Sequence, residues 1–195
     1  MKRIIIHTIF LAVCTVAVFT GCKKADSKIP VGLTYIYMPQ ATVSGGTTLN
    51  YLVPTGLDTN TYNFRIDTRN NKVNVPLGVL RSGEQIGAGY TVTVTTRADT
   101  VTQLISNGLI KVVPNATKTV VLLPATAYTL PASVTVPDNQ YMANFNLSID
   151  LPTLKAYAGQ KVALCVMISN ASAYTLNQVN NKVVIIIDVD SLKLP

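Results

Sequence analysis

Apolar and polar residues alternate along much of the chain, and this alternation predicts β-strands. Segments 62–66, 90–94 and 145–149 carry an apolar side chain at every second position, with asparagine, threonine, serine or arginine between them. A period of two gives each strand one buried face and one solvated face. Strands of this kind are typical of antiparallel sheets that expose one face to water.

Two other segments, 162–168 and 183–187, are apolar on both faces and too short to suggest a core helix. They are expected to be central strands that are covered on both sides. Further strands are expected at 34–38, 73–80, 119–123 and 133–136, separated by turn residues. Eight or nine strands of this kind predict an all-β fold, a sandwich of two antiparallel sheets.

One segment has a helical period, from Asp99 to Asn107. Asp99 can cap its start, Val101 and Leu104 share a face with Ile105, and the pair Asn107-Gly108 can supply a left-handed stop. This short helix is expected to connect strands and not to form a layer of its own.

The N-terminus has the pattern of a signal peptide. A basic start at Lys2 and Arg3 is followed by an apolar run over 4–19 and by the small residues Thr20 and Gly21. The run is shorter than the roughly 20 apolar residues that a membrane-spanning helix needs. We therefore expect residues 1–21 to be removed during export.

The residues around Cys22 resemble the cleavage box of bacterial lipoproteins, in which the new N-terminal cysteine carries the lipid anchor. Acyl chains on Cys22 would attach the protein to a membrane, because each buried methylene contributes about 0.8 kcal/mol. Residues 22–31 would then be a tether, and residues 32–195 the β-sandwich domain. The alternative is an ordinary secreted protein in which this cysteine stands at the cleavage point by chance.

The charge, histidine and cysteine content of the chain exclude several classes of function. The net charge of +7 falls to +5 when Lys2 and Arg3 leave with the signal peptide, and the remaining basic residues are scattered, so no nucleic-acid partner is expected. The same cleavage removes His7, the single histidine, and with it the commonest acid–base catalyst. Cys165 is left without a disulfide partner inside an apolar strand, where it is expected to be a small buried side chain. We expect no enzyme activity, no cofactor and no metal site.

Asp188 and Asp190 lie two residues apart at a predicted strand end, about 7 Å from each other. This spacing falls in the range of glycosidase carboxylate pairs, and the same oxygens could bind calcium. Without a partner aromatic residue or a calcium-loop pattern, a solvated strand end is the preferred interpretation.

The chain has nine tyrosines and no tryptophan, and tyrosine rings can stack on sugars. Most of the tyrosines, such as Tyr62 and Tyr90, occupy inward strand positions or the sandwich rim. Tyr141 and Tyr157 stand beside predicted turns and are the candidate ligand-binding residues.

The run Tyr35-Ile36-Tyr37-Met38-Pro39-Gln40-Ala41 resembles the opening motif of a Bacteroidetes lipoprotein family, domain of unknown function 1735. Segments 76–83, 90–94, 123–130 and 134–137 agree with the family in the same order. The resemblance implies an immunoglobulin-like β-sandwich on an outer-membrane lipoprotein. The family has no established catalytic residues to carry over.

These observations predict a noncatalytic, lipid-anchored outer-membrane module for surface binding or adhesion, with glycans as the expected ligand and the cell surface as the preferred side. The alternative is a structural subunit of a cell-surface or fimbria-like assembly, with another surface protein as its partner. If the resemblance holds, Thr100 and Ser191, each preceded by an aspartate and followed by an apolar residue, are candidate O-glycan acceptors.

Overall fold

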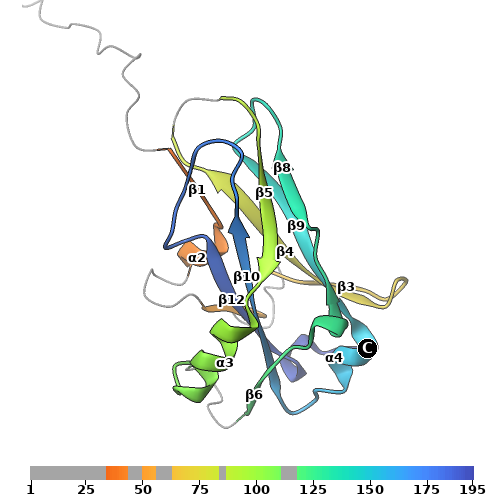
Figure 1. Cartoon of the computed structure of the whole chain (residues 1–195). Coiled ribbons are helices and arrows are strands. Elements are labelled where there is room, and N and C mark those ends of the chain that lie inside the picture. Colours follow the sequence, from red (N-terminus) through yellow and green to blue (C-terminus); the bar gives the residue numbers. More distant parts are fainter. Residues whose placement is uncertain (1–33, 44–49, 56–62, 84–86, 111–117) are drawn as a thin grey trace, which may run out of the picture. The chain divides into compact units, whose positions relative to one another are not determined.

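The alternating segments of the chain form two β-sheets that pack face to face (Figure 1). The computed structural model describes residues 34–43, 50–55, 63–83, 87–110 and 118–195. The predicted all-β sandwich is confirmed. No helix among these residues has the length and apolar character needed to cross a membrane.

Sheet A is built around β4 (Lys72–Arg81) and β9 (Met142–Asp150), which pair antiparallel from Lys72 opposite Asp150 to Leu80 opposite Met142. Its strand order is β11-β1-β4-β9-β7, and β3 also pairs with β4. The shorter strands are β1 (Tyr35–Tyr37), β3 (Arg65–Asp67), β7 (Tyr128–Thr129) and β11 (Thr175–Leu176).

Sheet B has β10 (Lys161–Ser169) at its centre, paired along most of its length with β12 (Lys182–Asp188). Its strand order is β2-β12-β10-β5-β8, with β6 paired to β10 beyond the end of β5. The other strands are β2 (Asn50–Val53), β5 (Tyr90–Thr96), β6 (Val120–Leu122) and β8 (Ser133–Val136).

The main core lies between the sheets and is formed by the inward face of each alternating strand. Val75 and Leu77 of β4 and Leu147 of β9 are fully buried on the sheet A side of this core. Val92 and Val136 are fully buried on the sheet B side. Burial of each such side chain contributes about 1.5–3 kcal/mol to folding. The alternation read over 90–94 and 145–149 therefore corresponds to the faces of real strands. In segment 62–66, by contrast, β3 begins only at Arg65, and Asn63, expected on the solvated face, is buried because its side chain hydrogen-bonds to the backbone of Leu52 and Thr55.

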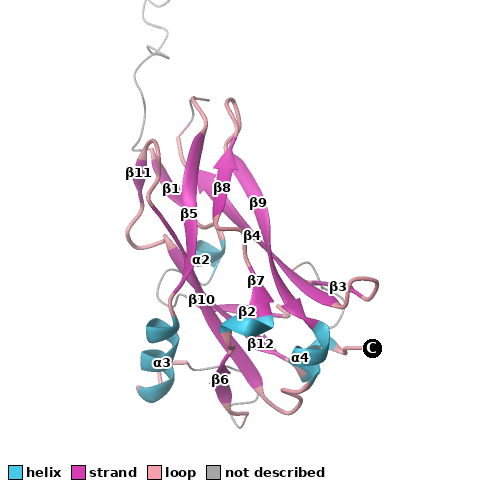
Figure 2. Ribbon diagram, turned by 45° about the vertical axis from the view of Figure 1, so that its right-hand side comes forward, coloured by secondary structure: helices cyan, strands magenta, loops and turns pink. Residues whose placement is uncertain are grey.

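A second, smaller core explains why β10 and β12 are apolar on both faces. Helix α3 (Ala98–Ser106) packs Val101 against Ala163 and Cys165 on the outer face of sheet B, next to Val184 and Ile186. Figure 2 shows α3 alongside β10 and near β6. The helix was expected only to connect strands, but it also covers part of a sheet.

The ends of α3 agree with the sequence in one respect and differ in another. Gly108 follows the helix with a φ of +63°, the left-handed stop that was predicted. Asp99 does not cap the start, because the helix begins at Ala98 and the Asp99 carboxylate instead accepts two hydrogen bonds from the Arg97 side chain. The other helical segments are short: α2 (Gln40–Val43), α4 (Leu151–Lys155), and the 3-10 turns η1 (Ala125–Ala127) and η2 (Asp190–Leu192).

The described residues contain twelve strands, more than the expected eight or nine. The additional strands β2, β7 and β11 have only two to four residues, too few for a period to be recognised. The sheets are also not purely antiparallel, because β1 pairs with β11, β2 with β12 and β6 with β10 in parallel. Such pairs join segments far apart in the chain, so local sequence does not signal them.

Candidate functional site

The central outward residues of β4 and β9 form a polar surface without charge. On these two strands the odd-numbered core residues point inward, so the even positions of β4 and the even positions of β9 face out in matched pairs. We call the three central pairs the amide face: Asn74 with Ser148, Pro76 with Asn146, and Gly78 with Asn144.

Contacts within the amide face hold its side chains in place. The Ser148 Oγ donates to Asn74 Oδ1 at 2.6 Å, and the Gly78 amide donates to Gln40 Oε1 at 3.1 Å. Gly78 has no side chain because a Cβ there would come within 3.2 Å of Pro39 and 3.3 Å of Asn144. Asn144 and Asn146 are exposed. The face therefore presents amide groups at its centre.

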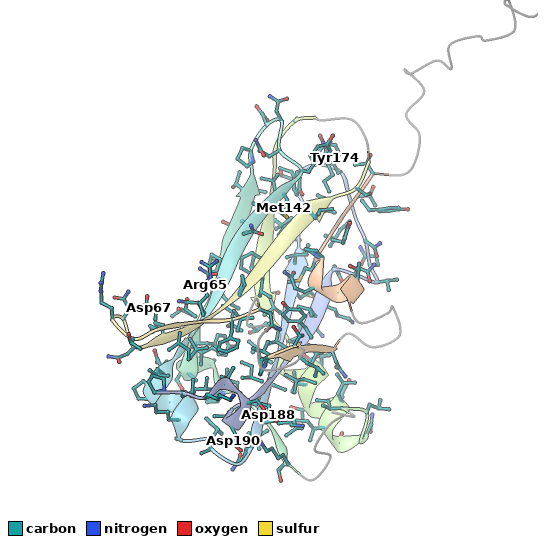
Figure 3. All side chains as sticks on the ribbon, turned by 180° about the vertical axis from the view of Figure 1, so that it is seen from behind. Arg65, Asp67, Met142, Tyr174, Asp188 and Asp190 are labelled. Carbon is teal, nitrogen blue, oxygen red and sulfur yellow. The ribbon has the colours of Figure 1, made fainter. Side chains whose placement is uncertain are left out.

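An apolar row borders the amide face at one end. Tyr37 pairs with Leu80, and Leu80 pairs with Met142 across β1, β4 and β9. The Met142 side chain is 45% exposed. Figure 3 shows Met142 toward this end, and Arg65 and Asp67 on the β3–β4 hairpin at the other end. At that far end, Lys72 forms an ion pair with Asp150.

This arrangement suits the recognition of polyhydroxylated ligands. An asparagine amide offers both donors and an acceptor, which matches a hydroxyl group that also donates and accepts. The neighbouring apolar row can pack against the C–H faces of a sugar ring. The six residues of the amide face include no titratable group, and its one hydroxyl, that of Ser148, donates to Asn74.

Tyr141, one of the two tyrosines predicted to bind ligand, lies at the apolar end immediately before Met142. Its side chain is 36% exposed, and the Arg81 guanidinium carbon lies 5.5 Å from the centre of its ring. Arg81 is buried and also lies 4.8 Å from the ring centre of Tyr174, a residue that the sequence did not indicate. Cation–π contact on both sides holds the Arg81 side chain between the two rings.

Tyr90 completes this tyrosine–arginine cluster from sheet B. Its ring meets Tyr174 edge to face, with the ring centres 5.7 Å apart. The Tyr90 hydroxyl is buried and has no hydrogen-bond partner in the part of the chain that the structure describes. Burial raises the pKa of Tyr90 to about 12. The inward position predicted for Tyr90 is thus confirmed, while Tyr62 lies outside the described residues.

Tyr157, the second candidate, is half-buried after α4 and packs against the main core. It is less exposed than its turn position suggested, because the residues that follow α4 lead directly back into β10. Tyr141 packs on Arg81, which is buried on the inward side of β4, so the Tyr141 ring does not belong to the outward amide face. The structure associates Tyr157 with the core.

Asp188 and Asp190 share a single ammonium group. The Lys118 Nζ lies 2.6 Å from Asp188 and 2.7 Å from Asp190. The Gly159 amide also donates to Asp190, and this hydrogen bond together with Lys118 lowers the pKa of Asp190. Both carboxylates are already satisfied by Lys118, which favours a structural role over a glycosidase pair or a calcium site. Asp188 and Asp190 lie at the opposite end of the sandwich from Tyr174 (Figure 3).

Lys161 belongs to the same group of charges. It is buried, and its Nζ lies 4.0 Å from an Asp188 oxygen. Burial lowers the pKa of Lys161, while Asp188 acts in the opposite direction.

Cys165 is buried between α3 and sheet B, as its apolar context predicted. Burial raises the pKa of its thiol to about 11, so little thiolate forms near neutral pH. The structure groups no three histidine, cysteine or acidic side chains as metal ligands in the segments it describes.

The modification candidates stay predictions. Thr100 is half-buried in the first turn of α3, and Ser191 is exposed in η2. Cys22, the candidate for lipidation, lies outside the described residues, as do the signal peptide 1–21 and the tether 22–31.

Sequence reasoning identified the solvated positions of β9 but not the amide face. Asn146 and Ser148 were assigned to a wet strand face, and this is correct. Their partners Asn74 and Pro76 lie about 70 residues earlier, and only the β4–β9 pairing brings the two sets together.

None of the curated proteins compared with this chain matches it. Solved structures from Bacteroides ovatus share its fold. A candidate carbohydrate-binding protein is 11% identical over 78% of this chain and 36% of its own, with a TM-score of 0.50. A multidomain protein that includes domain of unknown function 1735 is 14% identical over 80% of this chain and 45% of its own, also with a TM-score of 0.50.

A third structure from the same organism, of unknown function, is 17% identical over 78% of this chain and 45% of its own, with a TM-score of 0.50. The chain thus spans less than half the length of these structures. A family model described as a "-like, N-terminal domain" matches residues 34–175, well over half of the chain, so the protein belongs to this family of N-terminal domains.

Proposed function

We propose that this chain is a noncatalytic module that binds glycans through the amide face of sheet A. The observation that carries the proposal is the set of three central outward pairs on β4 and β9, which offer exposed amides and no charge beside an apolar row. Sheet faces that serve only to contact water usually carry charged side chains. An uncharged face with several amides is better suited to a ligand rich in hydroxyl groups.

The binding is expected to be weak and hydrated. The face has exposed hydrogen-bonding groups and few apolar contacts, so bridging waters would take part in recognition. Affinity would then depend on many copies of the ligand on a surface.

The proposal includes an anchor at Cys22 and a position at the outer membrane, preferably on the cell surface. Its support is the basic start, the apolar run and the small residues that precede Cys22. The tether 22–31 would hold the β-sandwich domain away from the lipid. The Bacteroides ovatus protein described as a candidate carbohydrate binder has the same fold, which is compatible with this function.

The alternative role as an assembly subunit has less support. Such a subunit needs a long free edge strand that can pair with another chain. Among the described residues the outermost strands of both sheets have two to four residues. Pro131 and Pro137 flank β8, and proline at an edge limits pairing.

The test is a glycan array followed by titration calorimetry with the glycan that binds. The double substitution Asn144→Ala and Asn146→Ala removes two exposed amides and should weaken binding about tenfold, through the loss of two hydrogen bonds. The control is Gln103→Ala with Asn107→Ala, which removes two exposed amides from α3 on the other sheet. This control should bind as the unmodified protein does.

Equal affinity of the Asn144/Asn146 variant and the unmodified protein would show that the amide face is not the site. No binding to any glycan, together with ordered oligomers in solution, would favour the assembly subunit instead.

A further inference from the structure

The amide face ends at a cation that has no partner among the described residues. Arg65, on β3, stands directly opposite Asn74, so its side chain leaves sheet A on the same side as the amide face. Arg65 is exposed, and its side chain makes no hydrogen bond or ion pair with the residues that the structure describes. Figure 3 shows Arg65 on the β3–β4 hairpin beside β4.

The neighbouring Asn74 presents a second donor. Because Ser148 donates to Asn74 Oδ1, the oxygen of this amide is directed toward β9. The Asn74 amino group is the other half of the same amide and has no partner among the described residues. Arg65 and Asn74, at directly opposite positions of β3 and β4, therefore place N–H groups that have no partner among the described residues on the same side of sheet A.

The two carboxylates of the adjacent row already have partners. Lys72 pairs with Asp150, and Asp67 accepts hydrogen bonds from the backbone and side-chain nitrogens of Asn70, at 3.0 and 2.8 Å. Neither of these carboxylates forms an ion pair with Arg65. An oxyanion of the ligand would be the acceptor that this end of the face lacks.

We propose that the ligand is an acidic glycan whose carboxylate or sulfate group binds Arg65 and Asn74. The inference rests on the proposed function, since the sugar rings would lie on the amide face. From the Asn74 row to the Gly78 row the face is about 14 Å long, enough for a short oligosaccharide. A guanidinium keeps its charge at all accessible pH values and can hold a carboxylate or sulfate through two parallel hydrogen bonds.

The experiment compares three ligands by titration calorimetry with the mature protein in detergent. They are an oligogalacturonate, the same oligosaccharide with its carboxyl groups reduced to alcohols, and a heparin-derived oligosaccharide. We expect at least one acidic ligand to bind about tenfold more tightly than the reduced one, because a charge-assisted hydrogen bond is about twice as strong as a neutral one. Oligogalacturonate carries only carboxylates, whereas the heparin-derived oligosaccharide carries both carboxylates and sulfates, so tight binding of the heparin-derived ligand alone would indicate recognition of sulfate. Added salt should weaken acidic binding more than neutral binding.

Three variants test whether Arg65 and Asn74 cause the preference for acidic ligands. Arg65→Gln should remove the preference for acidic ligands, because it weakens binding of the acidic ligands more than binding of the reduced oligosaccharide. Asn74→Asp keeps an acceptor for Ser148 but places a carboxylate beside Arg65. It should therefore also reduce the preference for acidic ligands. Arg69→Gln, at the exposed tip of the same hairpin, is the charge-matched control and should keep the preference. Unchanged circular dichroism of each variant would confirm that it is folded.

Equal binding of the acidic and reduced ligands, or a preference that survives Arg65→Gln, would overturn this inference while the proposed function stands. Failure of all glycans, acidic and neutral, would overturn both.

Discussion

The Ser148 hydroxyl donates to the Asn74 side-chain oxygen across the β4–β9 pair, over 2.6 Å. The two residues are 74 positions apart in the chain. Their contact fixes the direction of the Asn74 amide, and through it the donors at the charged end of the amide face.

Ser148→Ala should therefore lower both stability and selectivity. Loss of one half-buried hydrogen bond is expected to cost about 0.5–1.5 kcal/mol in the free energy of unfolding. Urea unfolding at constant m-value measures this loss. Ser133→Ala, at an exposed position of β8, is the control and should change stability by less than about 0.5 kcal/mol. Equal effects of the two substitutions would contradict the prediction.

Gly89→Ala should destabilise the start of β5. The Gly89 amide donates to Asp138 Oδ1, and a Cβ at this position would lie 2.6 Å from the Val136 carbonyl oxygen and 2.9 Å from the Asp138 nitrogen. Backbone must move to relieve these contacts, at a cost of about 1–3 kcal/mol. Thermal unfolding tests this, with Ala88→Ser at the exposed neighbouring residue as control. If Gly89→Ala is as stable as the control, the backbone at the start of β5 can move without cost, and the prediction is wrong.

The stability of the folded protein should fall at acid pH, because protonation of Asp190 weakens its contacts with Lys118 and Gly159. The Gly159 hydrogen bond and Lys118 lower the pKa of Asp190 below its ordinary value of 3.8. Its stabilising contribution is therefore complete above about pH 3.8 and is lost as the pH falls through the lower pKa of the folded state.

Thermal unfolding of the unmodified protein and of Asp190→Asn between pH 2 and pH 6 measures this effect. The difference in Tm should be largest near pH 6 and should shrink below about pH 4. Ser191→Ala, next to Asp190 and exposed, should follow the unmodified protein at every pH. A difference between Asp190→Asn and the unmodified protein that stays constant over this range would contradict the assignment.

Cys22→Ser should release the protein from membranes into the soluble fraction. A serine cannot carry the thioether-linked lipid, so the acyl chains that hold the protein would be missing. Cell fractionation and immunoblotting measure the distribution. Cys14→Ser, in the segment expected to be removed, should leave the protein in the membrane fraction. If the Cys22→Ser protein still pellets with membranes, the lipoprotein interpretation is wrong.

Local periodicity was enough to predict the main strands, their buried faces and the single longer helix. The alternation in β5 and β9 and the two-sided apolar character of β10 and β12 follow directly from backbone geometry, which repeats every two residues in a strand. The left-handed stop at Gly108 was also visible, because few residues adopt positive φ as readily as glycine.

Only the tertiary structure decided which strands adjoin. Pairing of β4 with β9 brings Asn74 next to Ser148, pairing of β3 with β4 brings Arg65 next to Asn74, and Lys118 reaches Asp188 from 70 residues away. The short strands β2, β7 and β11 form only where a longer neighbour offers backbone partners. These arrangements depend on how the two sheets bury their apolar faces together, and no pattern within a single segment contains that information.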